Sequence, residues 1–376
     1  MLGPLPRGTI CLLAVSIVLC SVGLRPDATG SAAAELSPDD DDYGEDGGDD
    51  SSSFSFAFPE TRPRGLVFGF YDDTCPDAEE IVSSTVRKLY HADPNVAAAL
   101  VRLFFHDCFI HGCDASVLLD DGADGRRSER DAGPNQSLRG FDAIEAIKRR
   151  VEAKCPGTVS CADILALAAR DSLVLVGGPT YPVLTGRRDS DQSFFNDVGG
   201  NIPAPNATYA MTLEAFARRG FTDRETVALL GAHSIGKVRC RFFRDRIYNF
   251  AGTGAPDDSI DPDMVGEMRA VCGGDGDGDG AAPMEMVYYR QGREVGFGAH
   301  YYAELLEGRG ILRADQQLTA GSTVRWVRVY ASGARGEKVF REDFAHAMVK
   351  LSALAPLTGS DGQVRISCSK RVDDNT

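Results

Sequence analysis

Apolar residues recur at helical spacing over most of the chain. Residues 78–91 place Ile81, Val82, Val86 and Leu89 on one face of a helix. The same periodicity predicts helices over residues 95–109, 140–154, 160–176, 209–219, 223–230 and 341–352. Strict alternation is scarce, although residues 324–330 are compatible with a strand. Because turn-forming segments separate the periodic ones, we expect an all-helical domain of about ten helices with long loops and no internal repeat.

The N-terminal residues have a different pattern. Arg7 precedes an apolar run, residues 10–24, which is short for a membrane span and is followed by small residues. We therefore expect residues 1–30 to be a cleaved secretory signal, with an uncleaved anchor as the alternative. Residues 31–65 are expected to be an acidic, disordered extension. Residues 66–372 then form the main domain, and residues 373–376 a short tail.

The charge is concentrated in the extension. Nine acids and no base lie between Glu35 and Asp50, which leaves −6 of the net charge of −15 for the rest of the chain. The main domain is thus only mildly acidic and has no basic stripe. We expect neither nucleic acid nor a membrane as its partner. With 376 residues, 43% of them apolar, the chain can form one large domain or two modest ones.

Ten cysteines occur, and two of them, Cys11 and Cys20, lie within the expected signal. The remaining eight are an even number in a chain that we expect to be secreted, so four disulfides are the default interpretation. Eight cysteines permit 105 pairings, and the count alone does not select one. Zinc binding is the competing interpretation, but the spacings lack a matching pair of CxxC motifs.

The segment RLFFHDCF (102–109) brings two polar side chains onto an apolar helix. Arg102 and His106 are four residues apart and share a face, with Phe105 beside them. Burying such groups is costly unless they are paired or line a polar pocket. The segment alone allows either a salt-bridged core pair or a functional pocket.

Two further segments carry candidate ligands. Asp107, Asp114 and Ser116 crowd hard oxygen donors into ten residues, with Gly112 between them, which favours calcium over an ordinary acidic loop. In GAHSIG (231–236), His233 has small neighbours that leave room for a flat, bulky group. A lone histidine is more often a hydrogen-bonded core or surface residue. Only the presence of the RLFFHDCF segment makes ligation of such a group the better interpretation of His233.

The ordered motifs resemble a known family, the secreted plant haem peroxidases of class III. The resemblance runs from about residue 66 to residue 372. It rests on LVFGFYDDTCP, RLFFHDCFIHGCDASVLLD, SLRGFDAIEAIK, CPGTVSCADILALAARDS, GGPTYPVLTGRRDS, NIPAP, GAHSIGKVRCRFF, KVFREDFAHAMVK and PLTGSDGQVRISC. It implies a fold of about ten helices in two lobes, with haem b between them, in a monomer. It also implies disulfides that join Cys75 to Cys155, Cys108 to Cys113, Cys161 to Cys368 and Cys240 to Cys272.

The resemblance also assigns roles within the main domain. His233 corresponds to the axial ligand of the haem iron, and Asp315 to the carboxylate that accepts its other N–H. His106 corresponds to the acid–base residue on the peroxide side, with Asn135 orienting it. Arg102 would stabilise negative charge there, and Phe105 would contact haem. Small aromatic donors would reach the haem edge near Pro203, Arg241 and Phe242.

Calcium is expected from the same resemblance. It implies one ion near His106, bound by Asp107, Ile110, Gly112, Asp114 and Ser116, with Glu129 behind them. A second family site would use Ser234 and three positions that fall on Arg290, Arg293 and Gly298. Two carboxylates have been replaced there, although Glu294 would restore one, so we expect this second ion to be absent or replaced. We expect an arginine to occupy the space and donate to Ser234 and nearby carbonyls.

These features predict a secreted, extracellular or cell-wall peroxidase that reduces hydrogen peroxide and oxidises small phenolic or aromatic donors in one-electron steps. A glycan is expected at Asn206 but not at Asn135, which we expect to be buried. One alternative is a catalytically inactive, secreted calcium- or haem-binding protein on the same scaffold. A calcium-storage glycoprotein is a third interpretation.

Overall fold

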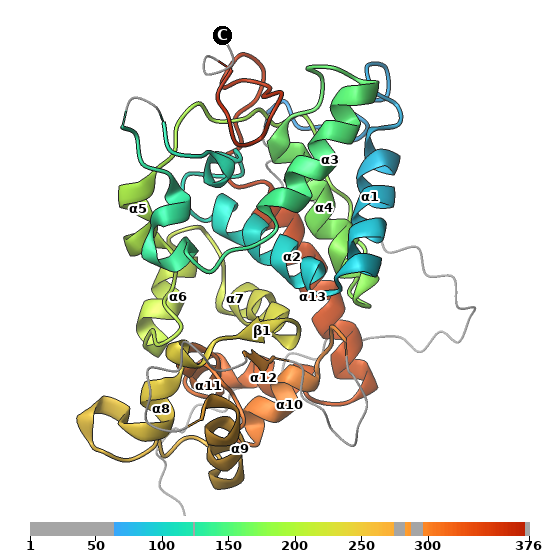
Figure 1. Ribbon diagram of the computed structural model, residues 1–376. Helices are drawn as coiled ribbons and strands as arrows, with labels where there is room; N and C mark the ends of the chain where they lie inside the picture. Colours follow the sequence, from blue (N-terminus) through green and yellow to red (C-terminus); the bar gives the residue numbers. More distant parts are fainter. Residues whose placement is uncertain (1–63, 123–124, 274–282, 287–295, 373–376) are drawn as a thin grey trace, which may run out of the picture. The chain divides into compact units, whose positions relative to one another are not determined.

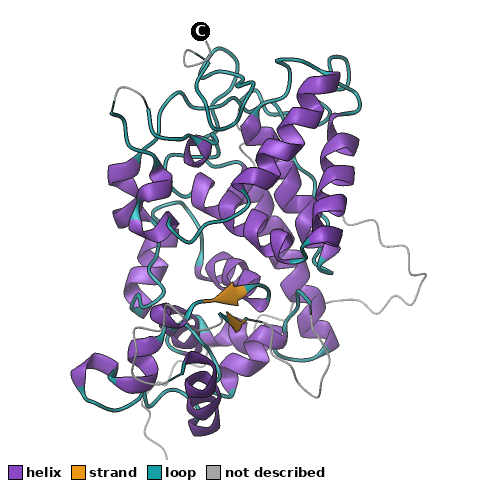
Figure 2. Cartoon of the chain, viewed as in Figure 1, coloured by secondary structure: helices purple, strands orange, loops and turns teal. Residues whose placement is uncertain are grey.

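The computed structural model describes residues 64–122, 125–273, 283–286 and 296–372. Helices dominate this part of the chain (Figures 1 and 2). They are α1 (Ala78–Ala92), α2 (Asn95–Cys108), α3 (Phe141–Lys154), α4 (Cys161–Leu175), α5 (Phe195–Asn201), α6 (Tyr209–Ala217), α7 (Asp223–Leu230), α8 (Arg244–Tyr248), α9 (Pro262–Cys272), α10 (His300–Leu306), α11 (Arg313–Gln316), α12 (Val324–Tyr330) and α13 (Ala334–Ser352). The expected signal, nearly all of the acidic extension and the last four residues lie outside the described ranges.

Two short strands, β1 (Lys237–Val238) and β2 (Met284–Glu285), pair in antiparallel fashion (Figure 2). Lys237 lies opposite Glu285, and the two side chains form an ion pair of 2.7 Å. The prediction of an all-helical fold is therefore confirmed in its essentials, since these four residues are the only paired strands in the described ranges. The described ranges contain thirteen α-helices and not the expected ten or so, because several of these helices are only one or two turns long.

The larger apolar cluster includes the contacts of α2 with α4 and of α1 with α3 and α4 (Figure 1), and it extends to buried residues of α7, α10, α12 and α13. Eleven of the fifteen residues of α4 are buried, including Ile164, Leu165 and Leu167. The helix begins at Ser160, whose side chain accepts the Asp163 N–H and satisfies one free donor of the first turn. A second, smaller apolar cluster joins α8 and α9 to the segment after β1.

Residues 324–330, which are compatible with a strand by sequence, form the helix α12. Val327 and Tyr330 are its buried residues, and their spacing of three places both on one face. Tyr330 packs against Tyr302 of α10 at 4.9 Å and Phe340 of α13 at 5.6 Å between ring centroids. Tertiary packing therefore decides the conformation of this short segment. The last helix, α13, also begins at Ala334 and not at the expected residue 341.

Four disulfides link the described cysteines, with the partners that the resemblance implies. The Cys161–Cys368 bridge joins the start of α4 to the C-terminal segment across 207 residues. Cys75–Cys155 spans 80 residues, Cys240–Cys272 spans 32, and Cys108–Cys113 spans only 5. The four bridges thus range from a local loop to a link across most of the domain.

Loss of the longest bridge should destabilise the domain most. In the chain-entropy description, a loop of this length contributes about 5 kcal/mol, and the five-residue loop about 2 kcal/mol. We expect the Cys161→Ala/Cys368→Ala protein to unfold at lower denaturant than the Cys108→Ala/Cys113→Ala protein, both with calcium present. Equal midpoints would show that loop length does not set the contribution of these bridges.

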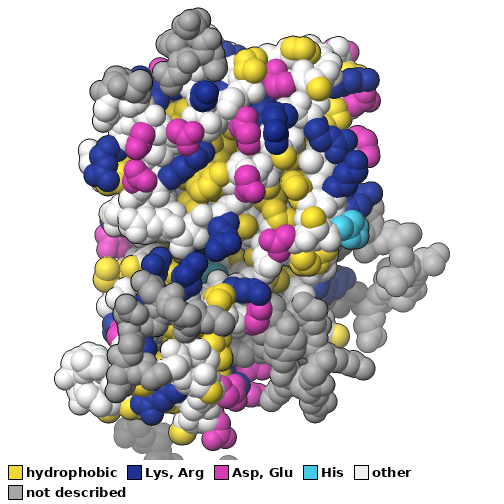
Figure 3. Space-filling model, viewed as in Figure 1, with side chains coloured by type: hydrophobic (Ala, Val, Ile, Leu, Met, Phe, Trp, Pro, Cys, Tyr) yellow, Lys and Arg dark blue, Asp and Glu magenta, His cyan; other side chains and the backbone are white. Residues whose placement is uncertain are grey.

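Acidic and basic side chains are interspersed on the face shown in Figure 3, with apolar side chains between them. Among the described residues, no helix combines the length and the apolar character needed to cross a bilayer.

Candidate active site

His106 lies near the end of α2 and is 4% exposed. Its Nδ1 is 2.7 Å from Oδ1 of Asn135, whose Nδ2 donates to the carbonyl of Glu129 at 2.9 Å. Because the amide nitrogen donates there, the amide oxygen accepts, and the imidazole proton belongs on Nδ1. Nε2 of His106 is therefore left as a bare acceptor. Burial, followed by the charge of Arg102, lowers the pKa of His106 to about 3.

Arg102 lies one turn before His106 on α2. Its Nη2 donates to the carbonyl of Pro134 at 3.2 Å. The side chain is solvent-exposed at this position, yet desolvation by the surrounding protein lowers its pKa to about 10, which leaves it charged at neutral pH. Since His106 bonds to Asn135, the two side chains are not the salt-bridged core pair that the sequence allows. Phe105 stacks on Phe109 at 4.3 Å between ring centroids and lies edge-on to His106 at 5.9 Å.

His233 lies in η4 (Gly231–Ser234), a 3₁₀ turn that directly follows α7. Its Nδ1 is 2.8 Å from Oδ1 of Asp315 in α11. Burial is the largest influence and lowers the pKa of His233, but the charge and hydrogen bond of Asp315 outweigh it, so the pKa is raised. Asp315 is 1% exposed, whereas the His233 side chain is 38% exposed. The ring is thus held at Nδ1, and the edge that carries Nε2 is left available.

Gly231 shows why small residues surround His233. A Cβ at this position would lie 2.4 Å from the Tyr302 hydroxyl and 2.5 Å from the Phe340 ring. The space beside Gly231 is therefore filled by aromatic side chains of α10 and α13, and our interpretation that it admits a bulky group is wrong at this residue. The glycine lets η4 pack closely against those two helices.

Arg102 connects the two histidines electrostatically. Its charge contributes to lowering the pKa of His106 and opposes the rise in the pKa of His233. The guanidinium is therefore within electrostatic range of both imidazoles, which come from segments 127 positions apart in the sequence. Each imidazole is held through Nδ1, and neither Nε2 has a hydrogen bond to another described residue.

Buried acids lie beside α2. Asp107 accepts the Ala115 N–H at 3.0 Å, and Asp114 accepts the Ser116 N–H at 3.0 Å. Burial and the charge of Asp114 raise the pKa of Asp107, while burial raises the pKa values of Asp114 and, to about 7, Glu129. Ser116 Oγ and Glu129 Oε2 are buried without a hydrogen-bond partner among the described residues. The cluster therefore holds excess oxygen acceptors in a desolvated site.

Comparison with known proteins identifies the family. Residues 82–333 match the family described as peroxidase. Peroxidase 9 of Arabidopsis thaliana is 42% identical over 300 residues, which cover 80% of this chain and 85% of that protein. Peroxidase 28 of the same species is 43% identical over 314 residues (83% and 95%), and Peroxidase N1 of Nicotiana tabacum is 43% identical over 309 residues (81% and 90%). The chain belongs to the plant class III peroxidase family.

Family membership makes this chain a peroxidase enzyme and implies haem as its cofactor. The residues present fit such a group. An iron ligand must offer an unprotonated nitrogen, and the Asp315 bond fixes the proton of His233 on Nδ1 and leaves Nε2 for a metal. Arg102 and the bare Nε2 of His106 supply a cation and a proton acceptor within the same site.

The remaining predicted residues of this peroxidase are only partly brought together. Arg241 lies over the ring of Phe242, at 4.9 Å from its centroid, whereas no backbone hydrogen bond between described residues joins Pro203 to that pair. Ser234 Oγ accepts the Gly298 N–H at 3.4 Å. Arg290, Arg293 and Glu294 lie outside the described residues. Asn206 is exposed and Asn135 is 2% exposed, and the glycan expected at Asn206 stays a prediction.

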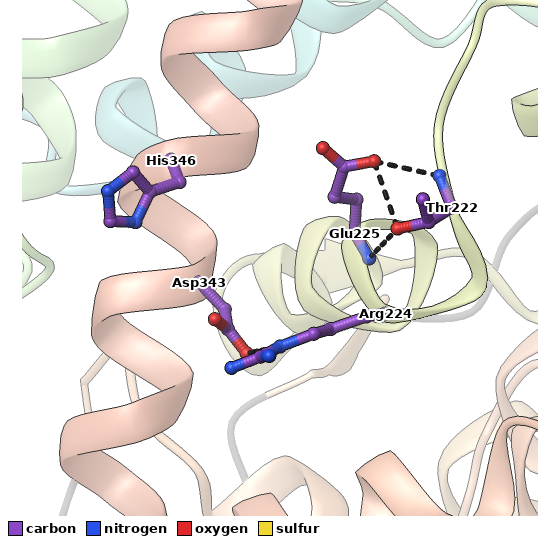
Figure 4. Close-up of a pocket in the computed structure, with 5 residues that line it drawn as sticks. All are labelled: Thr222, Arg224, Glu225, Asp343 and His346. Atoms are coloured by element: carbon purple, nitrogen blue, oxygen red, sulfur yellow. Dashed lines mark hydrogen bonds and ion pairs between the residues drawn. The ribbon is translucent and has the colours of Figure 1, made fainter. Parts of the chain in front are cut away.

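The hollow drawn in Figure 4 is separate from these residues. It is lined by Thr222, Arg224, Glu225, Asp343 and His346, from α7 and α13. Arg224 pairs with Asp343 at 2.7 Å, and Glu225 accepts the Thr222 N–H at 2.7 Å in a capping box. Glu225 also pairs with Lys350 of α13 at 2.8 Å, so both Arg224 and Glu225 hold α7 to α13.

Proposed function

We propose that this peroxidase binds haem b through His233 Nε2 and uses hydrogen peroxide to oxidise small phenolic or aromatic donors in one-electron steps. The proposal rests on one observation: both histidines are held as the same tautomer, with the proton on Nδ1. Each is fixed through Nδ1 by an acceptor, one neutral and one anionic, so each presents a bare Nε2. Haem supplies the redox-active iron at which peroxide is reduced.

The two acceptors suit different tasks. Asp315 is an anion and makes His233 more electron-donating, which favours oxidised iron. Asn135 is neutral, so it orients His106 without raising its pKa by a charge. His106 remains unprotonated at neutral pH and can take the proton of hydrogen peroxide at Nε2, then return it to the departing oxygen to form water. Arg102 stabilises the negative charge that develops on that oxygen.

An absorption spectrum tests the proposal directly. Correctly folded protein supplied with haem should show a strong Soret band and high-spin ferric features. It should then turn over a small phenol in the presence of peroxide. Folded protein without the Soret band would overturn the assignment of His233, and haem-bound protein without turnover would favour the inactive alternative.

We further propose secretion, with donors approaching near Pro203, Arg241 and Phe242. Four disulfides support an oxidising compartment, in which such bridges persist. The donor site is proposed from the family resemblance, supported by the contact between Arg241 and Phe242.

We propose one calcium ion beside His106, held by Asp107, Asp114 and Ser116 and by the carbonyls of Ile110 and Gly112. Among the described residues, no three acidic, histidine or cysteine side chains converge on one point. The site would therefore depend on hydroxyl and carbonyl oxygens besides the two carboxylates, which suits calcium. The unpartnered oxygens of Ser116 and Glu129 support a cation here.

Metal analysis checks this proposal. After exhaustive dialysis we expect about one calcium ion per chain, and its removal by a chelator should lower the melting temperature by roughly 5 °C. The melting temperature should fall because the ion binds these oxygens only in their folded arrangement. Two tightly held ions would show that a second site survives at Ser234, and an unchanged melting temperature would contradict the proposal.

A further inference from the structure

The turn at residues 296–299 joins three separate elements beside the candidate iron ligand. The N–H of Phe297 donates to the carbonyl of Val176, directly after α4, at 3.0 Å. The N–H of Gly298 donates to Ser234 Oγ in η4 at 3.4 Å. The N–H of Ala299 donates to Oε2 of Glu337 in α13 at 2.6 Å. Three successive amides of this turn thus each bond to a different part of the domain.

Glu337 and Arg341 hold this turn together from α13. They form an ion pair of 2.5 Å at a spacing of four residues. Arg341 Nη2 donates to the carbonyl of Phe297 at 3.1 Å, and its Nη1 donates to the carbonyl of Gly177. The pair is only about one-third exposed, at 32% and 33% for the two side chains. Together the two residues bind the turn and the end of α4 to one helix.

The Glu337 carboxyl also occupies the space beside Gly298. A Cβ at position 298 would lie 3.4 Å from each Glu337 oxygen and 3.3 Å from Nδ1 of His300. An aspartate at this position, where the resemblance puts a calcium ligand, would bring a second carboxylate close to Glu337. The negative charge beside Gly298 therefore comes from Glu337 of α13, and its ion pair with Arg341 already neutralises that charge.

We propose that Glu337, with Arg341, is a positioning residue for His233. The pair holds the turn at residues 296–299. Through Gly298 this turn fixes Ser234, the chain neighbour of His233, and no divalent ion is needed to hold it there. The inference rests on the proposed role of His233 as iron ligand. We call the pair and the turn it holds the proximal clasp.

The hydrogen bonds of the turn differ in strength, and the strongest of them is the one that holds the turn in place. The bond from Ala299 to the Glu337 carboxylate is short and charge-assisted, a class roughly twice as strong as neutral hydrogen bonds. The bond from Gly298 to Ser234 is long, so its geometry depends on the better-held residues on either side. The Arg341 cation also disfavours a divalent ion at the same point.

Two variants at one position test the clasp in the holoenzyme. Glu337→Ala removes the acceptor and the ion pair, whereas Glu337→Gln keeps a neutral acceptor for Ala299. The control is Glu214→Gln, because Glu214 and Arg218 form an exposed pair at the same spacing at the C-terminal end of α6. Three quantities are measured: the iron–imidazole vibration of the reduced enzyme, the rate of haem transfer to apomyoglobin, and the calcium content.

We expect Glu337→Ala to shift the vibration and to release haem about tenfold faster, with Glu337→Gln between it and the parent. The control should match the parent, and calcium content should not change in any variant. If Glu337→Ala does not fold, Arg341→Gln, which loses the bonds to Phe297 and Gly177, should cause the same spectral shift.

An unchanged vibration and haem-transfer rate in Glu337→Ala would overturn the clasp. Loss of one calcium ion from that variant would also overturn it, since Glu337 would then be a metal ligand. Failure of the proposed function looks different: the parent protein itself would lack haem before any variant is compared.

Discussion

Replacing His233 with alanine should give a folded protein that no longer retains haem. The change removes the only bond that we propose between the protein and the iron. It also leaves Asp315, which is 1% exposed, with both carboxylate oxygens unpaired, because its Oδ2 already lacks a partner among the described residues. We expect the ratio of bound haem to protein to fall to about a tenth of the parent value or less. Some loss of stability should accompany it, since an unpaired buried charge is costly.

The measurement is haem content from the Soret band after gel filtration. His91→Ala is a suitable control, because His91 is exposed at the end of α1. Added imidazole should restore part of the Soret band by filling the place of the deleted ring. Parent-like haem content without imidazole would exclude His233 as the axial ligand.

The periodic segments were the most predictable part of the fold. In α2 and α4 the apolar spacing identifies the helix because one continuous face is buried against a neighbour. Short elements were less predictable. Val327 and Tyr330 are buried at a spacing of three, but seven residues of alternating character are also compatible with a strand until Tyr302 and Phe340 are in place.

The active-site residues likewise divide into those that local spacing predicts and those that only the folded chain brings together. The spacing of four between Arg102 and His106 predicts a shared face, which local geometry is sufficient to establish. The partners of the two histidines lie 29 and 82 residues away, and only the family resemblance points to Asn135 and Asp315. The Glu337–Arg341 spacing is visible in the sequence, but its contact with the turn at 297–299 is not, because those residues meet only in the folded chain.

Replacing His106 with alanine should have the opposite effect to the change at His233: haem is kept and the reaction with peroxide is slowed. His106 makes no bond that we propose to hold haem, but it supplies the bare Nε2 that accepts the peroxide proton. Loss of a positioned acid–base group typically lowers the rate by about 100- to 10,000-fold. Stopped-flow absorbance after mixing with peroxide measures this rate, and a parent-like rate with full haem content would show that His106 is not the proton acceptor.

The pH profile of the parent enzyme provides a second measure of the same residue. His106 must be neutral to accept a proton, and burial together with Arg102 lowers its pKa to about 3. The rate with peroxide should therefore stay level from about pH 8 down to about pH 5 and fall only as the pH approaches 3, where His106 becomes protonated. Replacing Asn135 with aspartate puts a charged acceptor in place of the neutral one, which should raise the pKa of His106 and move this fall to higher pH. A profile that does not move in Asn135→Asp would show that a group other than His106 governs the acid limb.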